Sequence, residues 1–434
     1  MRTPSMLWWK KKGKEFTMNK DYVVIVDPYS SACLLPRDFN AAGFDCIAVH
    51  SQKTIPSNYA GSFHAQDFVA ETVFNDVELC AHFLKEYAPV AVLAGAESGV
   101  QKADLLTHHL ALSSNDFALS LARRDKFEMQ EAIAKQGIRA IKQLKTSQFD
   151  EIEPWLKSNN IQEFIIKPLA SAGSEGVSKC SNLDEARKAF DSILHSEDMF
   201  MQLNQAVLVQ EFIHGSEYVV DTVSCDGKSF VTNLCRYHKC QANGSDVVYR
   251  EMEFLHPEDE SLQEIIEYNQ GVLDALGITV GPAHSEIMLS PDGPVLIEVG
   301  ARIHGGYTPR TVQNFSSVSQ LDLTVDAFTN HSRFRERTSQ PPTFHKKALV
   351  QFFISTEEGK VEDVNGKEQL SKLDSYFDSV WGIAPQSKVS KTVDLFTSPG
   401  WVVLMNESAN ALNRDKQAAI DLEENHELYR LSSV

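Results

Sequence analysis

The sequence predicts a protein of several domains, of the α/β and α+β classes, that begins with a doubly wound parallel sheet. Its 434 residues are too many for one compact core and correspond to about three domains at roughly 150 residues each. Near the N-terminus, short apolar strands alternate with helix-like segments, which is typical of a parallel sheet. The strands are expected near residues 22–26, 46–49 and 90–93, and the helices near 31–42 and 77–87. The second half of the chain is richer in β-hairpin signals.

The composition narrows the class of partner. Hydrophobic residues make up 42% of the chain and charged residues 23%, as in an ordinary globular protein. The 41 basic and 59 acidic residues give a formal charge of −18 at pH 7. Nucleic acids and anionic membranes bind through clustered Lys and Arg, so neither is the expected partner. A nucleotide is not excluded, because it needs only a local cationic pocket. No apolar segment approaches the ~20 residues of a membrane span.

The cysteines and the first residues bear on location. The seven cysteines are odd in number and include no C-x-x-C pair, which indicates neither a disulfide framework nor a zinc site. A reducing cytoplasm is therefore the expected location. Residues 1–20 lack the apolar core of ~7–15 residues of a secretory signal, and are expected to be a disordered leader or tag. After the first strand, Tyr29-Ser-Ser-Ala replaces the G-x-G-x-x-G fingerprint of a dinucleotide fold, so a cofactor of that type is not expected.

Two lysines are candidates for phosphate binding. Lys167 ends an apolar strand and enters the small-residue loop P-L-A-S-A-G-S-E-G at 168–176. Loop amides can hold phosphate oxygens while a lysine supplies charge. The loop is not a Walker A motif, and an ordinary strand–helix connection is the alternative. Lys126, on a helix expected to carry Arg123-Arg124-Asp125-Lys126, is the second candidate; a solvated helical lysine is its alternative.

The segment Q-E-F-I-H-G-S-E at 210–217 is a candidate nucleoside site. A strand is expected to end here, and Glu217 begins the next. The exposed backbone at a strand end could hydrogen-bond an adenine edge, and Glu217 could accept hydrogen bonds from ribose hydroxyls. Asp226-Gly227 is a strong hairpin signal. If that loop has two residues, Glu217 faces Arg236, and a cross-strand ion pair is the alternative.

A second hairpin carries paired carboxylates. Pro291-Asp292-Gly293 suits a three-residue loop, which pairs Ser290 with Pro294 and places Glu286 directly opposite Glu298. Carboxylates in such positions lie about 5 Å apart and repel, so a cation is expected between them. Mg²⁺ commonly takes one or two carboxylates together with substrate phosphates. The alternative is a shifted register, or neutralisation by Arg302 and other basic groups.

Alternation along this hairpin assigns its two faces. The apolar face is expected to hold Ile287, Leu289, Val295, Ile297 and Val299. The opposite face is expected to hold His284, Glu286, Met288, Leu296, Glu298, Gly300 and Arg302.

Taken in order, these motifs resemble those of the ATP-grasp superfamily over about residues 124–306. The likeness rests on RDK, a strand lysine with a small-residue loop, QEFIHGSE, and two hairpin glutamates followed by Arg and Gly-Gly. It implies an ATP-grasp fold, ATP as cosubstrate, and Mg²⁺ or Mn²⁺, two ions in all. Phosphate contacts are implied for Lys126 and Lys167, metal binding for Glu286 and Glu298, and a catalytic role for Arg302. The remaining implied ATP contacts are Ser171, Ala172, Gly173, Ser174 and Gly176 over the phosphates, Glu211, Phe212 and Ile213 at adenine, and Glu217 at ribose.

One position departs from the pattern. Many members of the superfamily have E-x-N-x-R, in which Asn is a further metal ligand, whereas this chain has Gly300 between Glu298 and Arg302. Water or phosphate could take the place of that ligand. The segment E-V-G-A-R-I-H-G-G at 298–306 is most similar to L-amino-acid ligases that make dipeptides. That likeness places His304, Gly305, Gly306 and Tyr307 near an amino-acid pocket, with Arg236 as a weaker substrate candidate.

The resemblance implies an ATP-dependent carboxylate–amine ligase that works through an acyl phosphate and releases ADP and phosphate. Small-molecule acids and amines, expected to be amino acids, are the implied partners; a homodimer is left open. The alternatives are another ATP-grasp ligase or carboxylase acting on a different substrate, and a non-catalytic ATP-binding protein. The expected divisions are a leader at 1–20, an N-terminal α/β domain at 21–116, a small ATP-grasp subdomain at 117–205, a central catalytic domain at 206–342 and a C-terminal subdomain at 343–434.

Overall fold

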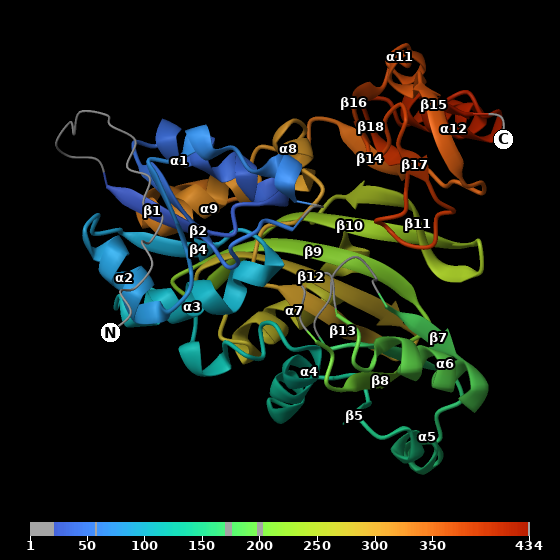
Figure 1. Cartoon of the computed structure of the whole chain (residues 1–434). Helices are drawn as coiled ribbons and strands as arrows, with labels where there is room; N and C mark the ends of the chain where they lie inside the picture. The colour runs from blue at the N-terminus through green and yellow to red at the C-terminus, as the bar shows by residue number, and fades with distance from the viewer. Residues whose placement is uncertain (1–20, 57–58, 170–175, 198–202, 433–434) are drawn as a thin grey trace, which may run out of the picture.

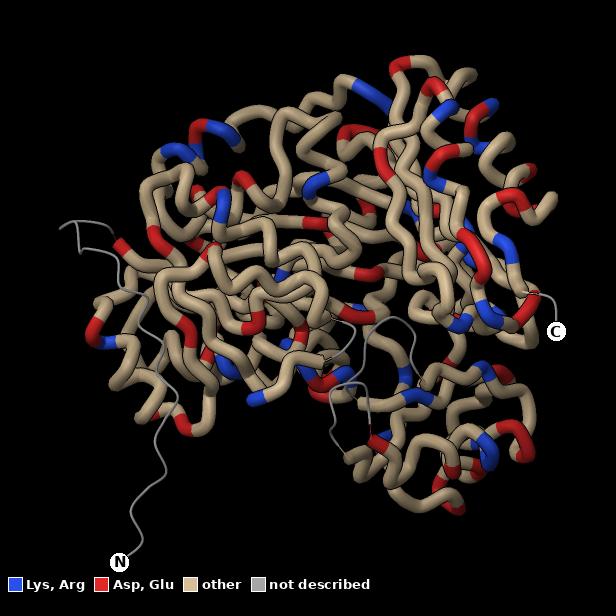
Figure 2. The backbone as a smooth tube through the Cα atoms, turned by 45° about the horizontal axis from the view of Figure 1, so that its top comes forward, with Lys and Arg blue, Asp and Glu red and all other residues tan. Residues whose placement is uncertain are grey.

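The computed structural model describes residues 21–56, 59–169, 176–197 and 203–432 (Figure 1). The N-terminal strands and helices, in blue, lie beside the large sheet, in green and yellow, and the red C-terminal lobe continues that sheet at its far edge. Basic residues (blue) and acidic residues (red) are interspersed over the described part of the chain (Figure 2). Among the described residues, no helix is long and apolar enough to cross a membrane. All seven cysteines are free, in agreement with the absence of a disulfide pattern.

The N-terminal sheet has the order β3-β2-β1-β4, and all its strands are parallel. The strands are β1 (Tyr22–Val26), β2 (Asp45–His50), β3 (Ala70–Val73) and β4 (Ala91–Ala94). Their apolar residues alternate between two buried clusters, one on each face. Because both faces are covered, nearly continuous apolar strands are required, and this is the pattern in the sequence.

Helices cover both faces of this sheet, so the predicted doubly wound arrangement is confirmed. One face packs against α2 (Val77–Lys85) and α3 (Val100–His109). The other packs against α1 (Leu35–Ala41) and, from much later in the chain, α9 (Gln320–Thr329). The long-range contact with α9 ties the N-terminal sheet to the segment that follows the carboxylate hairpin.

A small antiparallel sheet of order β5-β8-β6-β7 carries the candidate phosphate lysine. Its strands are β5 (Gln143–Thr146), β6 (Phe164–Pro168), β7 (Ser178–Cys180) and β8 (Val207–Glu211). The helices α5 (Ile152–Asn159) and α6 (Leu183–Ile193) bury their apolar sides against it.

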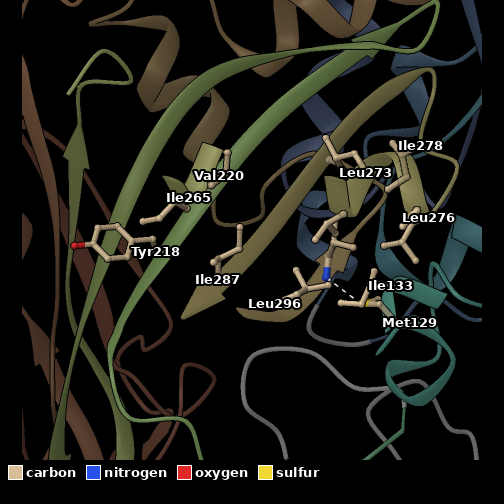
Figure 3. Close-up of a cluster of buried hydrophobic side chains, with 14 of the residues drawn as sticks. Met129, Ile133, Tyr218, Val220, Ile265, Leu273, Leu276, Ile278, Ile287 and Leu296 are labelled. Atoms are coloured by element: carbon tan, nitrogen blue, oxygen red, sulfur yellow. Dashed lines mark hydrogen bonds between the residues drawn. The ribbon is translucent and has the colours of Figure 1, made fainter. Parts of the chain in front are cut away.

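The central sheet has eight strands in the order β13-β12-β9-β10-β11-β14-β18-β16. These are β9 (Ser216–Cys225), β10 (Lys228–Ala242), β11 (Ser245–Leu255), β12 (Gly281–Ser290), β13 (Gly293–Gly300), β14 (Lys347–Phe352), β16 (Tyr376–Trp381) and β18 (Gly400–Asn406). One face packs on α4 (Lys126–Lys135) and α7 (Gln263–Ala275), where Met129, Ile133, Ile287 and Leu296 share an apolar core (Figure 3). That core leaves the opposite face of β12 and β13 available for polar side chains.

The remaining elements are short or lie in the C-terminal lobe. They are α8 (Thr308–Gln313), α10 (His331–Arg337), α11 (Gly366–Leu370), α12 (Ala409–Glu424), β15 (Gly359–Val364), β17 (Lys388–Val389) and β19 (Tyr429–Leu431).

The predicted helix over Arg123-Arg124-Asp125-Lys126 is wrong in its start. Helix α4 begins at Lys126, and Asp125 is its N-cap, accepting hydrogen bonds from the backbone N–H groups of Phe127 and Glu128. A carboxylate at the N-cap satisfies amides that lack a partner within the helix. The two arginines therefore lie in the turn before the helix, and their side chains contact residues of other elements.

Arg123 joins α3 of the N-terminal part of the chain to the end of α7 beside the central sheet. Its fully buried guanidinium donates to Asp104 Oδ2 on α3, at 2.8 Å from Nη2, and to the carbonyl oxygen of Leu276, at 2.9 Å from Nη1. Asp104 is itself 9% exposed. A buried charge is tolerated only when it is paired and hydrogen-bonded, and this arginine meets both conditions.

We predict that Asp104→Ala destabilises the protein by roughly 3–5 kcal/mol, because it leaves the Arg123 charge buried without its counter-ion. Urea unfolding followed by tryptophan fluorescence measures the change. Asp374→Ala is the control, because it removes one partner of the exposed Arg414–Asp374 pair and should cost less than about 1 kcal/mol. Equal losses in the two variants would contradict a structural role for the buried pair.

Candidate active site

The carboxylate hairpin brings Glu286 and Glu298 together as predicted, but by a different route. Ser290 pairs with Gly293, so the loop has two residues and the predicted three-residue loop is wrong. A β-bulge then inserts Ile297 into β13, and Glu286 pairs with Glu298. Each deviation shifts the register by one residue, and the two shifts cancel at the glutamates.

The same two shifts correct the expected faces. Between the loop and the bulge, Leu296 pairs with Ile287 and lies in the core against α7 and α4. The predicted placement of Leu296 on the polar face, and of Val295 and Ile297 on the core face, is therefore wrong. A one-residue slip moves every side chain to the other face, and the bulge restores the original alternation beyond it.

Cations lie against both carboxylates. Lys126 Nζ is 2.7 Å from Glu298 Oε2, and His284 Nε2 is 3.5 Å from Glu286 Oε1. Lys126 is only 6% exposed, so its interpretation as a solvated helical lysine is wrong. The predicted need for positive charge near the pair is met by the protein itself.

These charges keep Glu286 ionised. Burial opposes ionisation, yet the hydrogen bond and charge of His284, with Lys239 and Arg302, lower the pKa of Glu286 to about 2. Asp221 and Glu286 in turn raise the pKa of His284 to about 9 against the effect of burial. The hairpin therefore offers ionised oxygen donors at neutral pH.

Lys167 lies at the end of β6 and is 5% exposed. Burial and the nearby charge of Lys126 lower its pKa to about 8, with Glu298, Glu286 and Glu217 acting in the opposite sense. Two buried lysines thus approach the same group of carboxylates. Ser171, Ala172, Gly173 and Ser174 lie outside the described residues. Gly176 has φ +68°, and a Cβ there would lie 3.0 Å from Pro168 Cγ, so the loop returns close to its start.

The candidate adenine segment lies where β8 ends. The Glu211 carboxylate accepts from the backbone N–H of Lys142 at 2.9 Å, so this side chain orders the strand end. Phe212 donates its N–H to Glu163 O at 3.0 Å, and Lys179 Nζ lies 4.1 Å from its ring centroid. Ile213 follows in the same loop. The assignment of Glu211, Phe212 and Ile213 to adenine stays a prediction.

Glu217 lies at the site, but Arg236 does not face it. A bulge at Thr232 shifts the hairpin, so Glu217 pairs with Tyr237, and Arg236 pairs with Tyr218 on the opposite face. The expected Glu217–Arg236 ion pair is therefore wrong, and Arg236 is not brought to the carboxylates. Lys239 takes that place: its Nζ lies 2.9 and 2.8 Å from the two Glu217 oxygens.

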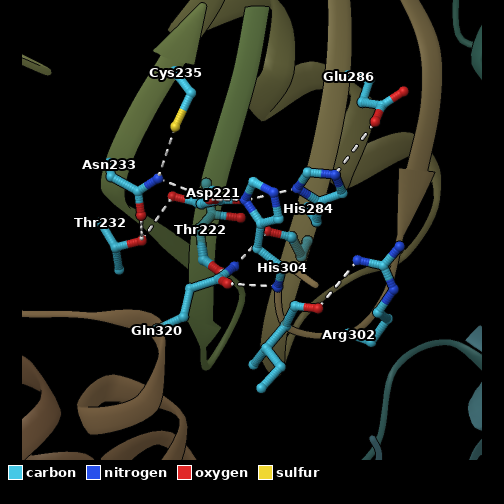
Figure 4. Close-up of polar contacts among 12 residues, drawn as sticks. Asp221, Thr222, Thr232, Asn233, Cys235, His284, Glu286, Arg302, His304 and Gln320 are labelled. Carbon is cyan, nitrogen blue, oxygen red and sulfur yellow. Dashed lines mark hydrogen bonds and ion pairs between the residues drawn. The ribbon is translucent and has the colours of Figure 1, made fainter. Parts of the chain in front are cut away.

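Asp221 organises a buried polar cluster that reaches Glu286 through His284 (Figure 4). Its two oxygens each lie 2.8 Å from an imidazole Nδ1, of His284 on one side and His304 on the other. Although burial opposes it, these imidazoles hold the pKa of Asp221 below its usual range. Asp221, His284 and His304 offer nitrogen and oxygen atoms that would suit a metal ion, but Asp221 already pairs with both imidazoles.

Arg302 follows the hairpin and reaches the N-terminal domain. Its Nε donates to Glu97 Oε2 at 3.0 Å and one Nη donates to the carbonyl oxygen of Ile303 at 3.0 Å. Glu97 lies just after β4 and is 8% exposed. The predicted catalytic arginine is therefore half-buried between two domains, beside the carboxylate hairpin.

The segment after Arg302 crosses to the N-terminal domain. His304 is 6% exposed and lies 3.3 Å from the Tyr237 hydroxyl through Nε2. Gly305 comes next, and Gly306 and Tyr307 have positive φ, +62° and +59°. Tyr307 donates its backbone N–H to Ser31 Oγ at 2.9 Å. The turn thus joins the hairpin end to the start of the N-terminal helices.

Two residues of this site, Glu97 and Asp221, were missed from the sequence, whereas His284 was predicted on the polar face of the hairpin. Asp221 had a signal, because it alternates with Glu217 on a strand whose neighbours are apolar. Glu97 also had one, since it follows the carboxyl end of a parallel strand, where α/β sheets place their ligands. Lys239 was a weak substrate candidate in the sequence, and its ion pair with Glu217 could not be predicted without the bulge at Thr232.

The residues present fit a divalent ion such as Mg²⁺. The donors are carboxylate oxygens, the ligand type that Mg²⁺ prefers, and they face one another in the ladder with Glu286 held ionised. Protonated lysines donate hydrogen bonds and do not act as metal ligands, so Lys126 beside Glu298 does not compete for the ion.

Comparison with known proteins identifies the class. Residues 161–310 match the ATP-grasp domain family. Dapdiamide A synthase of Enterobacter agglomerans is 33% identical over 93% of this chain and 96% of its own length. An L-arginine-specific L-amino acid ligase of Bacillus subtilis is 22% identical over 54% of this chain and 56% of its own. The crystal structure of an L-amino acid ligase from Bacillus licheniformis has a TM-score of 0.73 at 18% identity, covering 96% of this chain and 99% of that one.

The chain belongs to the ATP-grasp ligases, ATP-dependent enzymes that form C–N bonds. Within that class it is close to the L-amino-acid ligases, as the segment around Arg302 predicted.

We predict that kcat/KM for Mg·ATP falls as the pH rises through about 8. In the free enzyme Lys167 is charged below its lowered pKa and neutral above it, so its attraction for phosphate is lost on the alkaline side. Steady-state kinetics from pH 6.5 to 9.5 measure this limb. Lys167→Arg keeps its charge throughout the range and should remove the limb. An unchanged alkaline fall in that variant would assign the titration to another group.

Proposed function

We propose that the protein activates the carboxylate of one amino acid with ATP and joins it to the amino group of a second, through an acyl phosphate. The observation that carries this proposal is the convergence of two buried lysines, Lys126 and Lys167, on the opposed carboxylates Glu286 and Glu298. Such an arrangement concentrates charge where the β- and γ-phosphates of a nucleotide would lie. The named activities of the relatives support amino acids as substrates.

The resemblance to the ATP-grasp family supports a role for each of these residues. Lys126 and Lys167 contact the phosphates. Glu211 to Ile213 border adenine, and Glu217, held by Lys239, accepts from the ribose hydroxyls. Glu286 and Glu298 hold Mg²⁺ or Mn²⁺, which offsets phosphate charge and polarises the γ-phosphoryl group.

The reaction proceeds in two balanced steps. A carboxylate oxygen of the first substrate attacks the γ-phosphorus, and the bond to the β–γ bridging oxygen breaks, which releases ADP. The amino nitrogen of the second substrate then attacks the acyl carbon, loses a proton and expels inorganic phosphate. Arg302, next to the hairpin, stabilises the oxyanion that develops on the acyl oxygen.

An acyl phosphate must be protected from water until the amine arrives. The acid site is best placed between Arg302 and the turn at His304 to Tyr307, which packs on the N-terminal domain through Ser31. His304 and Tyr237 border the same region from the central sheet.

We predict that ADP, phosphate and dipeptide form in equal amounts from a productive pair of amino acids, with no AMP. An acyl phosphate requires attack on the γ-phosphorus, whereas an adenylate requires attack at the α-phosphorus. A panel of amino-acid pairs, screened by phosphate release and then by nucleotide chromatography and product mass, measures this. Substrate-dependent AMP would contradict the mechanism even if a peptide bond formed.

A second arm traps the activated acid. With the amine withheld, hydroxylamine should give the hydroxamate of the acid substrate, with one ADP for each hydroxamate. Lys167→Ala is the matched variant and should lower the yield, because a charged hydrogen bond to phosphate is worth ~1.5–3 kcal/mol. ADP formation that is independent of any acid would indicate a simple ATPase.

A further inference from the structure

Gly300 occupies a crowded place in the site. A Cβ added there would lie 2.7 Å from Glu97 Oε2 and 3.2 Å from Arg302 Cζ. Real Cβ atoms do not approach an oxygen this closely, so a side chain at position 300 would displace the tip of the Glu97 side chain. The glycine that departs from E-x-N-x-R therefore leaves room for a carboxylate from another domain.

Glu97 reaches this position from the N-terminal sheet. It lies in the turn between β4 and α3, is 8% exposed, and precedes Arg302 by 205 residues in sequence. Its Oε2 accepts from Arg302 Nε at 3.0 Å, and its Oε1 lies 3.8 Å from a guanidinium nitrogen of Arg124. One carboxylate thus lies between two arginines from different segments.

We propose that Glu97 is a positioning residue for the catalytic Arg302, and that Gly300 is required because only glycine lets the Glu97 carboxylate reach that arginine. The proposal rests on the function proposed above, in which Arg302 stabilises the acyl oxyanion. Glu97 touches neither ATP nor the reacting atoms in this account, and acts only through the guanidinium.

The geometry explains how the orientation is set. A guanidinium on a long side chain has several rotatable bonds, and its remaining donors must point at the acyl oxygen to be useful. Glu97 takes the Nε hydrogen, and the Ile303 carbonyl oxygen takes one Nη hydrogen. Because the guanidinium is planar and its donors have a fixed geometry, these two contacts together set its orientation. Loss of the first contact allows the group to rotate.

Two single variants and their combination test the proposal. Glu97→Ala and Gly300→Ala should each lower kcat by about 100-fold, the size of effect that a 1 Å misplacement produces, with KM for ATP unchanged. In the double variant, Gly300→Ala should add less than about threefold to the loss caused by Glu97→Ala, because both substitutions remove one contact. Glu97→Gln keeps an acceptor oxygen for Nε and should recover most of the lost kcat.

The same cycle read by thermal unfolding does not depend on any activity. Gly300→Ala should lower Tm when Glu97 is present and leave it nearly unchanged in the Glu97→Ala background, where the close oxygen is gone. Gly61→Ala is the control, since a Cβ at Gly61 meets nothing within 4 Å. It should change neither Tm nor kcat.

The outcomes separate the two proposals. If the losses in kcat add, or if KM for ATP rises with them, Glu97 does not act through Arg302, although the ligase function stands. If wild-type protein ligates no acid–amine pair, the proposed function fails, while the Tm cycle still tests the fit of Glu97 against Gly300. Additive Tm losses would overturn the requirement for glycine.

Discussion

The structure depends on the compensation of two carboxylates that face each other on a hairpin. Glu286 and Glu298 would repel at the distance a β-ladder imposes, and both are largely removed from water. They remain together because a cation lies against each of them. Lys126, at the start of α4, pairs with Glu298, and His284, on the same strand as Glu286, lies next to Glu286. Burial and the nearby charge of Lys126 shift the pKa of Lys167 downward, against the effect of the glutamates.

Each of the three sheets, or the loop that follows it, contributes charged side chains to this site. The small sheet supplies Lys167, the central sheet supplies the glutamates with Asp221 and its histidines, and the N-terminal sheet supplies Glu97. These charged side chains come together because α9 and the turn after Arg302 pack on the N-terminal sheet. Arg123 also joins α3 to the end of α7. The geometry of the candidate active site therefore depends on how these parts of the chain pack together.

Sequence patterns predicted what depends on local order and missed what depends on irregularity. The strands β1, β2 and β4 of the N-terminal sheet were predicted, whereas the edge strand β3 was not. The opposed glutamates were predicted because a short loop and a bulge cancel. Arg236 was assigned to the site wrongly because one bulge at Thr232 reverses the faces of β10. Glu97 was missed because its meeting with Gly300 is a contact between domains, and no spacing within either segment encodes it.

The central claim is that the opposed glutamates hold the divalent ion that accompanies ATP. Mn²⁺ binding followed by electron paramagnetic resonance, with a non-hydrolysable ATP analogue, tests it without turnover. Glu298→Gln should weaken Mn²⁺ binding by at least about tenfold. Asp292→Asn, at the exposed tip of the same hairpin, should bind as the wild type does. Equal Mn²⁺ affinity in the wild type and Glu298→Gln would contradict the account.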